Sequence, residues 1–495
     1  MNFTMNEKYK KVLDYVMIAV YAVITFLLVF KHEPWRDEAQ SWLLVQNSSL
    51  WELLVHHIRY QQHPALWYLI LFPFAKLSLP YFTQFVIHWA VAVAAVFIFV
   101  TKAPFERYLK YTFIFSFYMM HEYVLIARNY NIVILLLFLI AYLYPHRFKR
   151  PVLFGGLIAL LFNSNYIVFT AAGALLCIFA YEGYRRVKIN KELITGLSVA
   201  VIGGLIAFAY AFALPHDHYS YGASYSEPNF VNNVVAFGRA FIPLYWDVGQ
   251  KGVWAVGVTA AALIIVYLIR KPTMLFLLAG SFSGLIYIFT FRYGGFLRHF
   301  GIILILILFI LWVSTYYELK RPFKRGALLT RIFFIMLTMP LLLSVKYSIW
   351  ANTMEIKGYF SGGKPMAEAI DLISKKLNMD NDIIVAHPAT KTVSVAAYLP
   401  HRLFWHPEFQ EFGTYWKDTH QLDRDESLAQ TEIVIRAGKK FQDLSDTFFL
   451  LSKPLGFSQA FGYEFRLLHK IDRGVWGYGL ERYYLYKPVL IRKNE

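Results

Sequence analysis

Two adjacent carboxylates, Asp37 and Glu38, follow the first apolar run of the chain, in the segment 35–42. A carboxylate at the exit of a membrane helix is costly to desolvate, so this pair is a candidate functional site. An ionised carboxylate there can act as a general base towards a hydroxyl group, which is typically worth ~10²–10⁴ in rate. The alternative is a solvated loop, and the neighbouring segments weigh against it.

Other polar residues recur where the chain passes from loop to apolar run. His63 and Pro64 open the second run, where a histidine is either a hydrogen-bonding group at a helix start or part of a site. Glu122, Arg128 and Tyr130 interrupt a later apolar stretch. Glu122 and Arg128 either neutralise each other as an ion pair or contribute to the same site as Asp37.

A glycine-broken turn at 292–299 ends with Arg298 and His299. The topology predicted below puts this turn outside, where the positive-inside rule disfavours arginine. We therefore expect the turn to face an anion, which arginine binds well through its guanidinium group.

The elements that position these residues are membrane helices. Of 495 residues, 57% are hydrophobic and only 16% are charged. The apolar runs are continuous rather than alternating, which indicates helices, and we predict an α-helical polytopic membrane protein with about 11–13 spans and a C-terminal soluble α/β domain. The predicted apolar runs are 12–30, 63–79, 82–101, 109–126, 129–145, 152–163, 166–182, 193–214, 252–269, 273–291, 299–317 and 329–347.

Charge distribution predicts the orientation in the membrane. The net charge of +17 is spread over short basic clusters between apolar runs, at 146–150, 184–188, 270–271 and 320–325, which favours cytoplasmic loops over a nucleic-acid surface. The amino terminus is then cytoplasmic and the carboxyl-terminal domain extracytoplasmic, at the cell membrane. That arrangement requires an odd number of crossings. Either one run before residue 110 does not cross, or another crossing lies after Glu38.

Two outward loops break the apolar pattern. The loop at 31–62 has the spacing of short helices in the membrane interface. The loop at 215–250 contains His216, Asp217 and His218 together with several tyrosines. These aromatic side chains either line an acceptor path or simply populate the membrane interface.

The chain divides into a membrane domain at 1–350 and a soluble domain at 351–495, because charged residues become frequent beyond 350. The soluble domain is predicted to be a small α/β unit with a mixed sheet. Expected helices are 365–377 and 392–398, and expected strands are 382–386, 403–405, 448–451, 465–469 and 483–486.

These motifs together resemble those of a known family. The acidic pair after the first span, the histidine-proline start of the second, the segment 122–130 and the late arginine-histidine pair resemble the polytopic glycosyltransferases of the GT-C type. More specifically, they are similar to bacterial family 39 relatives, the protein mannosyltransferases and aminoarabinose transferases. The resemblance covers roughly residues 10–320, and the tail is similar only in being an outward α/β domain.

The resemblance implies a transferase that uses a polyprenyl-phosphate monosaccharide on the extracytoplasmic side. Asp37 would be the catalytic base, with Glu38 as its partner in the motif, and the acceptor hydroxyl would invert the anomeric carbon. His63 and Arg128, and also Tyr130, would lie near the lipid phosphate. Arg298 and His299 would join them there, and Glu122 is a further candidate.

The partners implied are a polyprenyl-phosphate sugar, membrane lipids and an envelope glycan, lipid or protein acceptor. Ala65 and Asn129 stand where relatives often have proline, which leaves the acceptor open. No cofactor is predicted. Carboxylates and histidines leave room for a divalent metal ion, but no fixed ligand spacing occurs. The competing hypotheses are a transporter or flippase for a lipid-linked sugar, disfavoured because no internal repeat is found, and a non-catalytic scaffold.

Overall fold

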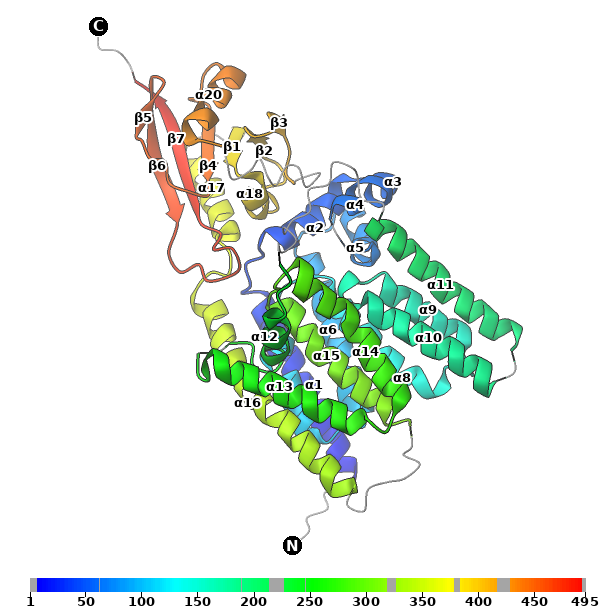
Figure 1. The fold of residues 1–495 in the computed structure, drawn as a ribbon. Coiled ribbons are helices and arrows are strands. Elements are labelled where there is room, and N and C mark those ends of the chain that lie inside the picture. Colours follow the sequence, from blue (N-terminus) through cyan, green and yellow to red (C-terminus); the bar gives the residue numbers. More distant parts are fainter. Residues whose placement is uncertain are drawn as a thin grey trace.

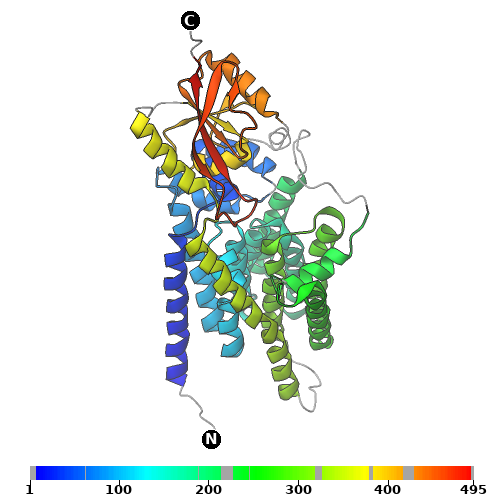
Figure 2. The same cartoon turned by 90° about the vertical axis from the view of Figure 1, so that its left-hand side faces the viewer.

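A helical bundle carries an α/β domain at one end (Figure 1). The computed structural model describes residues 7–61, 63–187, 189–212, 227–244, 246–317, 326–377, 383–415 and 428–491. Figure 2 shows α1 running from the opposite end of the bundle towards the α/β domain.

Most helices of the bundle coincide with the predicted apolar runs, but one short helix, Val231–Arg239, lies within the segment 215–250 that was predicted to be a loop. Its long helices are α1 (Glu7–Val29), α6 (Thr83–Lys102), α10 (Phe169–Arg186), α11 (Lys191–Phe212), α13 (Gly249–Leu268), α14 (Pro272–Tyr287), α15 (Leu297–Ser314) and α16 (Gly326–Lys357). Its shorter elements are α5 (Leu66–Lys76), α7 (Arg107–Ile114), η2 (Tyr118–Glu122), α8 (Tyr130–Leu143), η3 (Tyr144–His146), α9 (Pro151–Phe162), η4 (Tyr166–Val168), α12 (Val231–Arg239) and η5 (Ile288–Arg292).

Within the described residues, 8 helical segments are long and apolar enough to cross a membrane, and three shorter apolar helices accompany them. This confirms a helical protein with the character of a multi-spanning membrane protein, while the number of crossings stays a prediction. The run predicted at 109–126 divides after α7. Ser116 Oγ donates a hydrogen bond to the Phe113 carbonyl there, and such a side-chain bond competes with the helical pattern.

Helix α15 is the centre of the bundle. Every residue from Phe300 to Ser314 is buried, so this helix is apolar on all sides, as expected for an element surrounded by others. Its amino-terminal end lies towards the α/β domain (Figure 1). That end carries Arg298 and His299, and the packed remainder of the helix fixes where they lie.

The segment after the first helix folds into short helices, as predicted: α2 (Arg36–Asn47), α3 (Leu50–Glu52), η1 (Leu53–His57) and α4 (Ile58–Tyr60). Helix α2 begins in a closed cap, because the Glu38 carboxylate accepts a hydrogen bond from the Trp35 backbone N–H at 3.0 Å. Ala39 and Leu43 of α2 pack against Val393 and Ala397 of the α/β domain. Helix α2 therefore joins the bundle to that domain.

The α/β domain contains a seven-stranded mixed sheet in the order β3-β2-β1-β4-β7-β6-β5. Strand β1 is parallel to β2 and β4, and the remaining pairs are antiparallel, which confirms the predicted mixed sheet. Its elements are α17 (Gly363–Leu377), β1 (Ile383–His387), α18 (Ala389–Ala396), β2 (Leu403–His406), β3 (Glu411–Phe412), α20 (Gln430–Phe441), β4 (Thr447–Leu451), β5 (Gln459–Ala460), β6 (Tyr463–Ile471) and β7 (Tyr483–Leu490).

Helices cover both faces of this sheet because side chains alternate along each strand. Ile384 faces the core formed with α17 and α18, whereas Val385 faces the core formed with α20. Helix α20 was not among the predicted elements. Helix α16 continues through residue 350 and ends at Lys357, so it leads from the bundle into the α/β domain.

Some predicted features fall outside the described residues: the basic cluster 320–325, and His216, Asp217 and His218 of the 215–250 loop. Of the rest of that loop, Asp247 forms an ion pair with Lys346 of α16, at 2.7 Å.

Helices α9 and α11 approach closely through small residues, as membrane helices often do. Small buried residues recur along one side of α11 at Gly196, Ala200, Gly203 and Ala207. A methyl group on Gly155 of α9 would lie 1.9 Å from the Gly196 carbonyl oxygen, whereas one on the neighbouring Gly156 would meet nothing within 4 Å.

We therefore expect Gly155→Ala to lower the melting temperature of the purified protein, because forced overpacking typically costs ~1–3 kcal/mol. The matched control Gly156→Ala should leave stability unchanged or slightly raised, since alanine favours helix over glycine. Thermal unfolding in one detergent measures both. Equal effects of the two variants would contradict the packing described.

Candidate functional site

Four chain segments far apart in sequence meet at the end of the bundle next to the α/β domain. They are the first turn of α2, the loop before α5, the loop before α8 and the first turn of α15. Each carries one of the predicted site residues at or beside a helix end. We name Arg36, Asp37, His63, Arg128 and Arg298 the Asp37 cluster.

The centre of the cluster is an ion pair between Asp37 and Arg128. Arg128 Nη1 lies 2.5 Å from Asp37 Oδ2, and the two side chains are 12% and 20% exposed. Arg128 Nη2 lies 2.9 Å from His63 Nε2. Arg36 Nε lies 3.8 Å from Asp37 Oδ1. The partial exposure leaves the carboxylate accessible while the guanidinium group is held on two sides.

Arg298 completes the cluster from the first turn of α15. Its charge acts on the Asp37 carboxylate, and its guanidinium group lies over the rings of Trp35 and Tyr478, 5.7 Å from each centroid. Cation–π contacts of this kind hold a guanidinium group without neutralising it. Arg298 therefore keeps its full positive charge beside Asp37.

Tyr130 and His299 lie next to the cluster. Their rings meet edge to face with centroids 6.0 Å apart. His299 Nδ1 accepts a hydrogen bond from the Phe296 backbone N–H at 2.9 Å, which closes the start of α15. A neutral His299 then carries its proton on Nε2, where it can donate to an anion.

The Asp37 carboxyl is ionised despite its surroundings. Burial opposes ionisation, but Arg128, Arg298 and Arg36 outweigh it and hold the pKa of Asp37 below its usual value. Within the cluster, three guanidinium groups thus act on this one carboxylate. Arg128 and Arg298 also stand at the starts of α8 and α15, where the helix dipole is positive and favours an anion over a cation.

The structure changes the role predicted for His63. Burial first, and then the charge of Arg128, lower the pKa of His63 to about 3, so its imidazole is neutral at pH 7. Arg128 is always protonated and can only donate, so His63 Nε2 accepts its hydrogen bond. His63 therefore orients Arg128 instead of supplying positive charge to a phosphate.

Glu38 is separated from the cluster although it follows Asp37 directly. Adjacent helical residues point about 100° apart, because an α-helix has about 3.6 residues per turn. Glu38 is fully buried and accepts hydrogen bonds from the backbone N–H groups of Trp35 and Ala127, at 3.0 and 2.6 Å. The prediction of a catalytic role beside Asp37 is not supported by this placement. Glu38 fastens the start of α2 to the loop that carries Arg128.

Glu122 also has a partner that the sequence did not suggest. Its Oε2 accepts a hydrogen bond from the Tyr478 hydroxyl, at 2.5 Å. Arg128 is engaged by Asp37 and His63, so the alternative of a Glu122–Arg128 ion pair is wrong for these described residues. Glu122 instead joins the bundle to the α/β domain.

The segment between β6 and β7 brings the α/β domain against the site. Tyr478 from this segment contacts Trp35, with ring centroids 5.4 Å apart, as well as Glu122 and Arg298. Glu481 Oε1 accepts a hydrogen bond from the Arg36 backbone N–H at 3.0 Å. Sequence analysis missed Tyr478 and Glu481 because they lie in a separate domain more than 400 positions from Asp37.

Two carboxyl groups at the same junction carry raised pKa values. Burial raises the pKa of Glu33 and of Glu481 to about 7, and their hydrogen bonds only partly oppose this. Glu33 accepts from the Phe360 backbone N–H at 3.0 Å, and Glu481 also accepts from the Ser361 hydroxyl at 2.6 Å. Both groups hold the two parts of the protein together.

A separate buried network lies beneath α2. Glu355 of α16 accepts from His32 and His121, at 3.1 and 3.0 Å through one carboxylate oxygen. His32 also contacts Glu38, at 3.2 Å. Across the described ranges of the chain, no three histidine, cysteine or carboxylate side chains form a group that could hold a metal ion.

Comparison with known proteins adds no assignment. No protein-family model matches the chain, and no curated protein matches it. The functional interpretation therefore depends on the geometry of the Asp37 cluster.

The junction, which is the contact between the helical bundle and the α/β domain, includes Glu33 and Glu481. It should weaken as pH rises. A carboxyl group whose folded-state pKa is raised stabilises the fold fully below its unfolded value, here 4.5, and loses that contribution as pH rises through about 7. We expect melting temperature to fall between pH 5 and pH 8, and Glu33→Gln with Glu481→Gln to flatten this dependence. Thermal unfolding across that range measures it.

The control is Glu432→Gln, which removes a carboxylate from an ion pair on α20, away from the junction. This variant should retain the wild-type dependence of melting temperature on pH. A double variant with an unchanged slope would show that Glu33 and Glu481 do not govern the junction.

Proposed function

We propose that the protein is a GT-C-type glycosyltransferase that moves a monosaccharide from a polyprenyl-phosphate donor to an envelope acceptor. The observation that supports it is the composition of the Asp37 cluster. One partly exposed, ionised carboxylate is surrounded by three guanidinium groups at positive helix ends. Such a site offers a general base and, beside it, charge for a phosphate leaving group.

Donor binding would free the base. In the unoccupied arrangement Arg128 is committed to Asp37. A donor phosphate offers Arg128 a stronger partner, because arginine can bind phosphate oxygens through two parallel hydrogen bonds. Asp37 would then lose its nearest cation, its pKa would rise towards the ordinary range, and the carboxylate would turn to the acceptor hydroxyl.

The transfer step balances with the residues of the cluster. The acceptor hydroxyl gives its proton to Asp37 while its oxygen bonds to the anomeric carbon. The bond from that carbon to the phosphate oxygen breaks, and the electron pair leaves with polyprenyl phosphate. Arg128 and Arg298 would stabilise the phosphate charge, and His299 would donate a hydrogen bond from Nε2. In-line attack inverts the anomeric configuration.

An apolar groove supports a lipid-linked donor. It lies between α13 and α16, with Phe241 at its edge and a volume of about 540 Å³ that includes its open side. The guanidinium group of Arg239, two residues before Phe241, lies over the ring of Phe300. Phe300 in turn follows Arg298 by two residues in helix α15. A polyprenyl chain in this groove would therefore place its phosphate end towards the cationic cluster.

The distribution of charge supports an extracytoplasmic site. The carboxyl end of α10 and the α13–α14 connection, near the basic clusters 184–188 and 270–271 of the sequence, lie at the end of the bundle away from the α/β domain (Figure 1). By the positive-inside rule that end is cytoplasmic, and the Asp37 cluster and α/β domain are outside. The acceptor would then be a glycan, lipid or protein of the envelope.

The proposal is tested by Asp37→Asn in a transfer assay. Transfer of radiolabelled sugar from a membrane lipid fraction, normalised to folded protein, should fall ~10²–10⁴-fold, because the amide cannot accept the proton. The matched control is Asp14→Asn. Asp14 forms a comparable ion pair with Arg107, at 2.7 Å, but on α1 outside the cluster. This control should retain wild-type turnover per folded molecule.

Undiminished transfer by Asp37→Asn would contradict the proposal. Wild-type protein that moves a lipid-linked sugar across the bilayer without forming a new glycosidic bond would favour a transporter. The two outcomes are distinguished by measuring product and lipid orientation in the same vesicles.

A further inference from the structure

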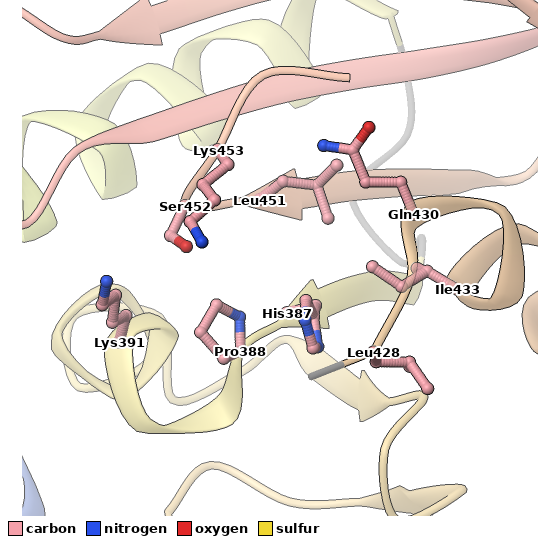
Figure 3. Close-up of a pocket in the computed structure, with 9 residues that line it drawn as sticks. All are labelled: His387, Pro388, Lys391, Leu428, Gln430, Ile433, Leu451, Ser452 and Lys453. Carbon is pink, nitrogen blue, oxygen red and sulfur yellow. The ribbon is translucent and has the colours of Figure 1, made fainter. Parts of the chain in front are cut away.

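A pocket lies in the α/β domain, apart from the residues of the Asp37 cluster. It is found at the carboxyl ends of the parallel strands β1 and β4 and has a volume of about 460 Å³, including its open side (Figure 3). His387 ends β1, Leu451 ends β4, and both line it. Nothing in the proposed transfer reaction uses this pocket.

The pocket occupies the position where an open parallel sheet usually binds ligands. After β1 the chain passes through α18 to β2 on one side, and later through α20 to β4 on the other side of β1. The strand order therefore reverses between β1 and β4. At such a point the connections diverge and leave a crevice beyond the strand ends.

Two lysines give the pocket its charge. Lys391 from α18 and Lys453 after β4 both line it, on the side that also carries Ser452 (Figure 3). Neither lysine forms an ion pair with a carboxylate in the described part of the chain. The Lys391 backbone is fixed, because its carbonyl accepts a hydrogen bond from the Tyr483 hydroxyl at 2.7 Å.

The nearby carboxylate is already engaged. Glu408 Oε2 lies 3.1 Å from His387 Nδ1, and Glu408 Oε1 accepts from the Ala389 backbone N–H at 2.7 Å. Glu408 is buried and therefore does not extend to the lysines as a partner. Among the residues that the structure describes, no carboxylate neutralises the two ammonium groups, which can therefore bind a negatively charged ligand.

The turn after β1 is not suited to binding a nucleotide. Pro388 has no N–H group, and the Ala389 N–H is used by Glu408. The start of α18 thus lacks the free backbone donors that a pyrophosphate requires, and the turn has no glycine-rich sequence. Charge recognition here depends on side chains, which suits a ligand with a single anionic group.

The remaining lining residues suit a compact ligand with both apolar and hydroxyl groups. Leu428, Ile433 and Leu451 are apolar, and Ser452 provides a hydroxyl beside the lysines. A sugar ring presents an apolar C–H face together with hydroxyl groups, which matches this combination of apolar and hydroxyl-bearing side chains. We propose that the pocket binds a saccharide unit that carries a phosphate or a carboxylate group, with the anion between Lys391 and Lys453.

The test uses the full chain in nanodiscs and saturation-transfer NMR with glucose 1-phosphate, glucuronate and glucose. Glucose 1-phosphate and glucuronate should bind, and glucose should bind roughly tenfold more weakly or not at all, because charge-assisted hydrogen bonds are the stronger kind. The double variant Lys391→Ala with Lys453→Ala should weaken the anionic ligands roughly tenfold. Lys376→Ala, an exposed lysine of α17, is the matched control and should change nothing.

Thermal unfolding of each variant verifies that the domain remains folded. Equal binding of glucose and glucose 1-phosphate, or binding that survives loss of both lysines, would overturn the proposal. Binding of a hyaluronate tetrasaccharide distinguishes a saccharide unit within a polymer from a free sugar. Tighter binding than glucuronate supports a unit within a polymer, and weaker binding supports a free sugar.

Discussion

The balance between one carboxylate and three guanidinium groups is the constraint on which the rest of the structure depends. Burying positive charge without a partner is costly, so Asp37 must stay ionised and close to Arg128. The cations nevertheless outnumber it, and two of them stand at helix starts that already favour an anion. The cluster therefore favours binding of a further anion, which supports the proposal of a phosphate-bearing substrate.

The α/β domain is part of this arrangement and not an independent appendage. Tyr478 holds both Glu122 and Arg298, while Glu33 and Glu481 fasten the domain to the start of α2. The site therefore includes surfaces from both parts of the chain. In the proposed reaction, an acceptor approaching from outside the membrane would meet the α/β domain beside the site. The same domain has its own lysine-lined pocket.

Much of the fold could be predicted from the sequence because continuous apolar runs and alternating strands are local signals. The short helices after Glu38 and the mixed sheet were predicted in this way, whereas α20 was missed. Asp37, Arg128 and Arg298 were selected because charges are costly at a membrane, and the structure brings them together. The partners could not be predicted. Whether Glu122 meets Arg128 or Tyr478, and whether His63 is a cation or an acceptor, depends on packing between distant segments.

The most direct test of the account is the affinity of the protein for a short-chain polyprenyl phosphate, compared between wild type and Asp37→Asn. If phosphate and Asp37 compete for Arg128, removing the carboxylate charge should tighten binding several-fold although the variant cannot transfer sugar. Adding Arg128→Ala to Asp37→Asn should abolish the tighter binding, which would show that the effect acts through Arg128. Equal or weaker binding by Asp37→Asn would contradict the claim that this carboxylate competes with the phosphate for Arg128.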